Sequence, residues 1–355
     1  YIVLKRLAAE YDLGMAYYYL GCLLYDKRVY GEAVADYEKA ALKYPEFPTV
    51  HRNLALAYYN VKKQPQRAYE ELTKAFALDE TDARVYLELD QLKKRLNISM
   101  KERLSDMDKH FVLVKSRDDL YLEYVTLMNT LGENAKALVL IEARQFHQWE
   151  GGEGKVAAQY LTALHQLAKA AVVKGDYAEA KSLLLRAVGE YPHNLGEGKL
   201  ESAQENNLYY LLGLVQEKLG ETEDALDCLT KACHGESEPV GMMYYNDQPP
   251  EMIYYQGLAY RKLGDEEQAV QRFCKLVDYG KEHIGDEIKI DYFAVSLPDL
   301  LIFEENLNER NRKHCLFMMS LGLRGLGQTD EAKACAEELL SMDTRESGYM
   351  ICNHA

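Results

Sequence analysis

The chain has 355 residues, of which 48% are hydrophobic and 28% are charged, and its formal net charge is −15 at pH 7. Nucleic acids and anionic lipid surfaces bind basic protein faces, so this charge argues against both as partners. The sequence also contains no run of 18 apolar residues, so we expect no membrane-spanning segment.

The first feature along the chain is a pair of helical stripes that ends at a proline. The stripes carry Tyr17, Leu20 and Gly21, then Ala33, Tyr37 and Ala40, and stop at Pro45. Residues spaced i, i+3, i+4 and i+7 lie on one face of a helix, so two amphipathic helices joined by a short turn are predicted. Residues 1–12 have the character of the closing helix of an earlier unit. Because the chain begins at Tyr1, we expect it to be part of a longer protein.

The same pattern returns at a period near 34 residues. The clearest copies run from Leu20 to Ala40, Leu54 to Ala75, Leu167 to Ala187, Leu212 to Ala232 and Gly257 to Leu276. Weaker copies run from Tyr121 to Arg144 and from Leu316 to Leu340, and a degenerate one from Tyr86 to His110. A single helix pair cannot bury its apolar stripe alone, so neighbouring pairs are expected to stack into one core.

These small and large residues, in nearly fixed phase, resemble the tetratricopeptide repeat. The resemblance implies an all-α fold, a right-handed solenoid of about eight helix pairs, and a non-catalytic protein-interaction scaffold. We expect residues 1–355 to form one continuous domain, more than about two-thirds helical, well above the one-third typical of globular proteins. Stacking should be weakest near 83–117, where the small-residue signature is missing.

Four segments do not fit the repeat and are expected to be long loops between repeats, near 145–160, 194–206, 233–250 and 281–312. With the repeats, they resemble the C-terminal half of large bacterial proteins that carry, upstream, a domain similar to the β-sandwich of aldose epimerases. That resemblance implies a carbohydrate-related context for the parent protein. Insertions of this kind gather on one face of a solenoid, often the binding face, or only patch irregular stacking.

Two functions remain open at this point. In the first, the repeats dock a protein or peptide segment, which could come from the upstream domain of the same polypeptide. In the second, the inserted loops complete a carbohydrate site together with that domain. There a tryptophan would stack on a sugar ring and polar side chains would bind its hydroxyls: Trp149, Glu150, Glu153, Asn246 and Asp247. Carboxylates in loops more often cap helices than catalyse, so we expect no catalytic residues in this chain.

Tyrosine is the most informative residue type beyond the repeat, with 28 copies against 8 phenylalanines and 1 tryptophan. The family resemblance places certain positions of each first helix on the concave surface. Tyrosine offers a large apolar ring with a polar tip at low entropic cost, which suits recognition of a partner. The predicted partner-binding residues are Tyr18, Tyr25, Arg52, Tyr59, Tyr210, Tyr254 and Phe317.

Metal and cofactor sites are not expected. The seven cysteines are scattered, mostly within predicted helices, which is typical of reduced thiols in a cytoplasmic protein. Gly-Glu-Gly-Lys occurs twice, ending at Lys155 and Lys199, but a phosphate-binding loop would need a further glycine five positions before the Gly-Lys and a preceding strand.

Overall fold

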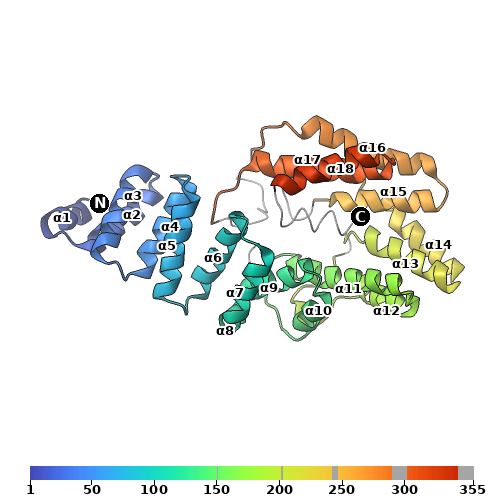
Figure 1. Ribbon diagram of the computed structural model, residues 1–355, viewed down its shortest axis with the longest axis horizontal. Helices are drawn as coiled ribbons and strands as arrows, with labels where there is room; N and C mark the ends of the chain where they lie inside the picture. The colour runs from blue at the N-terminus through green and yellow to red at the C-terminus, as the bar shows by residue number, and fades with distance from the viewer. Residues whose placement is uncertain (150, 201–202, 242–246, 290–301, 343–355) are drawn as a thin grey trace. The chain divides into compact units, whose positions relative to one another are not determined.

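The computed structural model describes residues 1–149, 151–200, 203–241, 247–289 and 302–342. Helix makes up 74% of this part of the chain, which has no strand, and the all-α prediction is confirmed. None of the described helices is long and apolar enough to cross a membrane. The chain divides into two compact units, which we describe separately (Figure 1). Unit 1 comprises Tyr1–Leu120 with Leu301–Glu305, and unit 2 comprises Tyr121–Leu300 with Asn306–Ala355.

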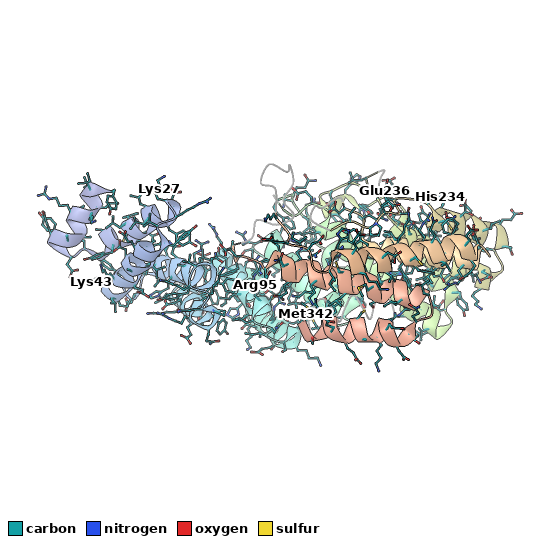
Figure 2. The ribbon with its side chains drawn as sticks, turned by 90° about the horizontal axis from the view of Figure 1, so that it is seen from above. Lys27, Lys43, Arg95, His234, Glu236 and Met342 are labelled. Carbon is teal, nitrogen blue, oxygen red and sulfur yellow. The ribbon has the colours of Figure 1, made fainter. Side chains whose placement is uncertain are left out.

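Unit 1 is a row of stacked helices. Its helices are α1 (Ile2–Tyr11), α2 (Gly14–Asp26), α3 (Tyr30–Lys43), α4 (Pro48–Asn60), α5 (Pro65–Leu78), α6 (Ala83–Arg95), α7 (Met100–Lys109) and α8 (Phe111–Val114). Proline at the first helical position starts α4 and α5, where a missing N–H costs nothing. Lys43, labelled in Figure 2, closes α3 and bonds Asp12 of the turn after α1.

Small residues allow close approach of the two helices of a repeat. A Cβ added at Gly21 of α2 would lie 2.5 Å from the ring of Tyr37 on α3. In unit 2, the ring of Phe273 is approached in the same way by Gly257 and Gly325. These contacts are the structural reason for the small-to-large pairing in the sequence pattern.

The end of unit 1 is joined differently. Where α6 and α7 meet, the guanidinium of Arg103 donates to both carboxylate oxygens of Asp90, at 3.0 and 2.6 Å. Both residues are buried, with 2% and 3% of their surfaces exposed. A buried ion pair thus replaces the small-residue contact in the stretch where the repeat signature is degenerate. The contacts group into two units that meet in sequence at residue 120, and one continuous domain over residues 1–355 stays a prediction.

Unit 2 is built from further helix pairs. Its helices are α9 (Asp118–Thr130, which begins in unit 1), α10 (Asn134–Glu142), α11 (Lys155–Lys174), α12 (Tyr177–Val188), η1 (His193–Leu195), α13 (Asn206–Leu219), α14 (Thr222–Cys233), α15 (Pro250–Lys262), α16 (Glu266–His283), α17 (Leu307–Gly325) and α18 (Thr329–Met342). Gly175 and Gly220 adopt positive φ directly after α11 and α13, as C-terminal glycines do. The predicted loop at 145–160 is shorter than expected, because α11 already starts at Lys155.

Side-chain amides hold the start of the connection between α14 and α15. Asn206 donates to the carbonyls of Ala232 and His234, at 2.9 and 2.6 Å. Gln256, which is completely buried, donates to the carbonyl of Glu236 at 2.8 Å. Figure 2 labels His234 and Glu236 at the start of this connection. The amides satisfy backbone groups that no helix can satisfy here.

Candidate protein-interaction surface

Two tyrosine–asparagine contacts join α2 to α4 in unit 1. The side chain of Asn53 acts on the hydroxyl of Tyr18 and lowers its pKa, and the side chain of Asn60 does the same to Tyr25. Both tyrosines and both asparagines are seven residues apart, about two helical turns, so the contacts lie on one face. We call the surface formed by Tyr18, Tyr25, Asn53, Tyr59 and Asn60 the Tyr–Asn face.

Tyr18 and Tyr25 of this face are neutral at physiological pH, because their pKa values are raised. Burial raises the pKa of Tyr18 to about 12, with a further rise from its hydrogen bond to Cys22. Burial also raises the pKa of Tyr25. A neutral phenol both donates and accepts hydrogen bonds, and its ring offers apolar area to a partner.

A short segment of the same chain lies on one end of the Tyr–Asn face. Residues 301–305 belong to unit 1, although they follow Asn60 by more than 240 residues. The side-chain N–H of Asn60 donates to the carbonyl of Ile302 at 2.8 Å, and its carbonyl accepts the backbone N–H of Glu304 at 2.8 Å. The side chain of Asn60 therefore binds the backbone carbonyl before Phe303 and the backbone N–H after it.

The side chains of this segment make two further contacts. The ring of Phe303 meets the ring of Tyr59 edge to face, with centroids 5.0 Å apart, and Phe303 is only 1% exposed. Glu304 accepts an ion-pair bond from Lys63 at 2.6 Å, and both side chains are about two-thirds exposed. The ring contact is expected to contribute more, because exposed ion pairs are typically worth about 0–1 kcal/mol.

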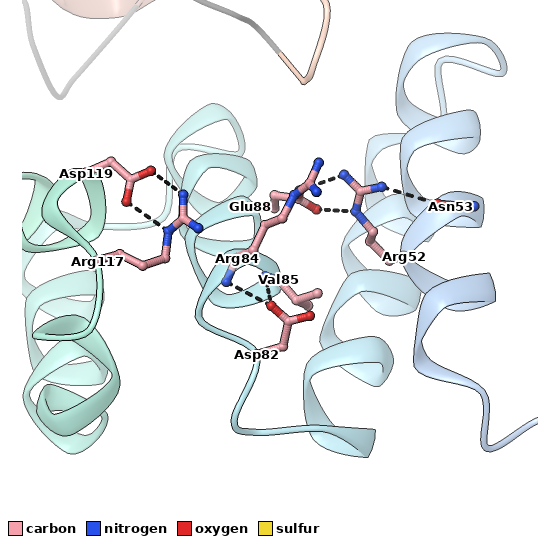
Figure 3. A network of polar contacts seen from close by, with 8 residues as sticks. All are labelled: Arg52, Asn53, Asp82, Arg84, Val85, Glu88, Arg117 and Asp119. Carbon is pink, nitrogen blue, oxygen red and sulfur yellow. Dashed lines mark hydrogen bonds and ion pairs between the residues drawn. The ribbon is translucent and has the colours of Figure 1, made fainter. Parts of the chain in front are cut away.

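Arg52 is committed to a contact within unit 1. Its guanidinium donates two bonds of 2.7 Å to Glu88 of α6, whose carboxylate is completely buried (Figure 3). Arg84 donates to the same carboxylate at 3.1 Å. Burial alone would lower the pKa of Arg52, but the bonds to Glu88 leave it raised. We therefore assign Arg52 to packing between repeats and leave it out of the Tyr–Asn face.

The predicted binding residues of unit 2 lie in or against its core. Tyr254 and Phe317 are 6% and 2% exposed and pack in one cluster around Phe273. Tyr210 is half-buried against the same cluster, with its ring 5.7 Å from that of Tyr255. This is a correction to the sequence interpretation, which placed all three on a concave surface. A partner could reach Tyr254 or Phe317 only if the core opened.

The residues of the carbohydrate hypothesis are only partly described. Trp149 and Glu153 line a pocket of about 260 Å³ together with Glu197. Asp247 is not among the residues that line it, and its charge acts instead on Tyr279 and His314. The remaining two candidates, Glu150 and Asn246, fall outside the described residues.

The contacts around this pocket have a structural purpose. Glu197 accepts the backbone N–H groups of Gly154 and Ala157 at 2.8 Å each, and so caps the start of α11. The ring of Trp149 packs over Gly152, where an added Cβ would lie 2.3 Å from it. Within the described residues, no group of three or more His, Cys, Asp or Glu could hold a metal ion.

Comparison with known proteins identifies the repeating unit. A family model described as tetratricopeptide repeat matches residues 18–83 and 165–238, and a second model of the same description matches 251–279. These segments are tetratricopeptide repeats. The Tyr–Asn face thus lies on the first helices of two successive tetratricopeptide repeats, α2 and α4.

Several solved structures are similar to the chain. A tetratricopeptide repeat protein from Parabacteroides merdae is 14% identical, with 74% of this chain and 91% of that chain covered and a TM-score of 0.40. The structure of Naa15/Naa10 bound to HypK-THB matches at 15% identity, with 96% and 55% covered and a TM-score of 0.38. YrrB, a TPR protein with an unusual peptide-binding site, is 18% identical, with 61% and 95% covered and a TM-score of 0.31.

Sequence reasoning missed the two residues that define the contact with the docked segment. Asn60 directly follows Tyr59 and lies seven residues after Asn53, so its helical phase could have placed it beside the tyrosines. Phe303 lies in the inserted segment predicted near 281–312, but nothing in the local pattern connects it with Tyr59.

Proposed function

We propose that the chain is a non-catalytic protein-interaction scaffold, and that the Tyr–Asn face of unit 1 binds a protein segment. The observation that carries this proposal is the pair of 2.8 Å bonds from the Asn60 side chain to one carbonyl and one N–H of a peptide backbone. The amide thus holds backbone groups on both sides of Phe303, as in other complexes where main-chain bonds give affinity and side-chain contacts give specificity.

The rest of the face supports the same function. Tyr18 and Asn53 lie two helical turns before Tyr25 and Asn60 on the same two helices, and the Asn53 amide accepts from Arg52 at 3.3 Å and donates to Cys22 at 3.7 Å. They offer a second position at which a longer segment could be held. The segment would come from another protein, or from an upstream domain of the same polypeptide.

Selection from a phage-displayed library of random peptides tests this function. The library is panned against the full chain and against its Phe303→Ala variant, in which the docked segment loses its ring. Selected peptides should bind at least tenfold more weakly to Asn53→Ala or Asn60→Ala. They should bind unchanged to Tyr11→Ala, because Tyr11 is 63% exposed on α1 and lies outside the Tyr–Asn face. Failure to select any peptide that depends on these asparagines would refute the proposal.

A further inference from the structure

The segment 302–305 has the composition and contacts of a peptide ligand. It is Ile-Phe-Glu-Glu, and its backbone is held by a side chain of α4 and not by a neighbouring helix or strand. The one side chain of the four that is buried is Phe303, and the two acidic side chains that follow it are exposed. A loop that only connects two helices does not require an aromatic side chain buried against a distant repeat, as Phe303 is against Tyr59.

Each contact selects a different property of the segment. The Asn60 bonds engage the backbone on both sides of Phe303 and do not depend on the side chains. The edge-to-face ring contact with Tyr59 selects an aromatic residue, since such pairs gain energy beyond buried area. Lys63 selects an acidic residue directly after the aromatic one. The negative charge of Glu304 also raises the pKa of Tyr25.

We propose that residues 302–305 are an internal ligand of the Tyr–Asn face, and that its partner carries the same chemistry: a segment with an aromatic residue followed by an acidic one. The partner must displace the internal segment in order to bind. This inference rests on the proposed function and specifies both its partner and its regulation.

Tethering makes the internal segment an effective competitor. A segment on the same chain as its site can act at an effective concentration on the order of 1 mM. If a free peptide of the same sequence binds the vacant face with a Kd of roughly 100 μM, the tethered copy weakens its apparent affinity about tenfold. A partner with more contacts, for example to Tyr18 and Asn53, would overcome this.

The test uses the full chain and a fluorescein-labelled peptide, Gly-Ile-Phe-Glu-Glu-Gly, followed by anisotropy. We expect the peptide to bind the Phe303→Ala chain at least tenfold more tightly than the wild-type chain. Binding should be lost when Asn60→Ala is added to Phe303→Ala, and retained when Tyr11→Ala, outside the Tyr–Asn face, is added as the control. A peptide with alanine in place of phenylalanine should not bind.

A second variant covers the case in which Phe303→Ala unfolds unit 1. Glu304→Pro removes the N–H that Asn60 accepts without deleting the ring, and it should raise peptide affinity in the same direction. Equal binding to wild-type and variant chains, or no binding to either variant, would overturn the inference. If library peptides bind through Asn53 and Asn60 but do not compete with the labelled peptide, the internal-ligand inference fails while the scaffold function stands.

Discussion

Breaking the ion pair between Asp90 and Arg103 should destabilise unit 1 more than any surface substitution. Asp90→Asn removes the negative charge but keeps the shape, so the guanidinium of Arg103 stays buried at 2% exposure without its carboxylate. Removing one partner of a buried pair typically costs about 3–5 kcal/mol, because a buried charge then lacks compensation. For a urea m-value of about 2 kcal/mol/M, a loss of 4 kcal/mol lowers the midpoint by about 2 M.

Urea unfolding followed by two signals measures this effect. Circular dichroism follows the helices of both units, whereas the single tryptophan, Trp149, lies in unit 2 and reports on that unit. The matched control is Glu10→Gln, which breaks an exposed i,i+4 pair with Arg6 and should cost less than about 0.5 kcal/mol.

Replacing both charges of the pair tests the same electrostatic explanation. A double variant, Asp90→Leu with Arg103→Met, removes both charges at once and should be far less destabilised than Asp90→Asn, because apolar replacement of a buried pair is often neutral or stabilising. A circular dichroism midpoint for Asp90→Asn that matches Glu10→Gln would show that burial of this pair carries no such cost. A double variant as unstable as Asp90→Asn would refute the electrostatic account and favour lost packing.

Two further predictions concern packing and pH. Gly21→Ala should lower the stability of unit 1 by about 1–3 kcal/mol, because the added Cβ meets the Tyr37 ring at 2.5 Å. Gly31→Ala, whose added Cβ meets nothing within 4 Å, should leave the stability unchanged or raise it by up to about 1 kcal/mol. Thermal melts of both variants measure the two effects. Burial lowers the pKa of His314 below 6.5, opposed by its bond to the carbonyl of Val240, so the unfolded chain binds more protons below pH 6.5 and the stability of unit 2 should fall as the pH drops through that value. Tryptophan-detected unfolding between pH 7.5 and 5 should show this slope, at most about 1.4 kcal/mol per pH unit, and His314→Gln should remove it; equal slopes in both proteins would contradict the assignment.

The fold was predictable because its determinants are local and repeat. The approach of Gly21 to Tyr37, and of Gly257 to Phe273, lies within one helix pair, so each leaves a fixed spacing in the sequence. The join between α6 and α7 has no such signature, because it depends on the Asp90–Arg103 pair, which lies where small residues are missing. Charged residues at those positions look like ordinary solvated helix residues until their burial is known.

The site was predictable only in part. The family resemblance, read by helical position, placed Tyr18, Tyr25 and Tyr59 among the candidates; all three lie on α2 and α4, and their binding role stays a prediction. The same rule failed for Tyr254 and Phe317, because phase alone does not reveal whether later helices cover a position. It cannot find Phe303 at all, since no spacing relates residues more than 240 positions apart.

That separation has a consequence for the order of events during synthesis. The contacts within α1 to α5 join neighbours in sequence, so these helices can pack soon after they leave the ribosome, at a stage when Ile302 does not yet exist. At about 5–20 residues per second, the 242 residues between Asn60 and Ile302 take roughly 12 to 50 seconds to make. Throughout that interval every nascent chain presents a vacant Tyr–Asn face, and a partner that meets the chain on the ribosome has no internal segment to displace.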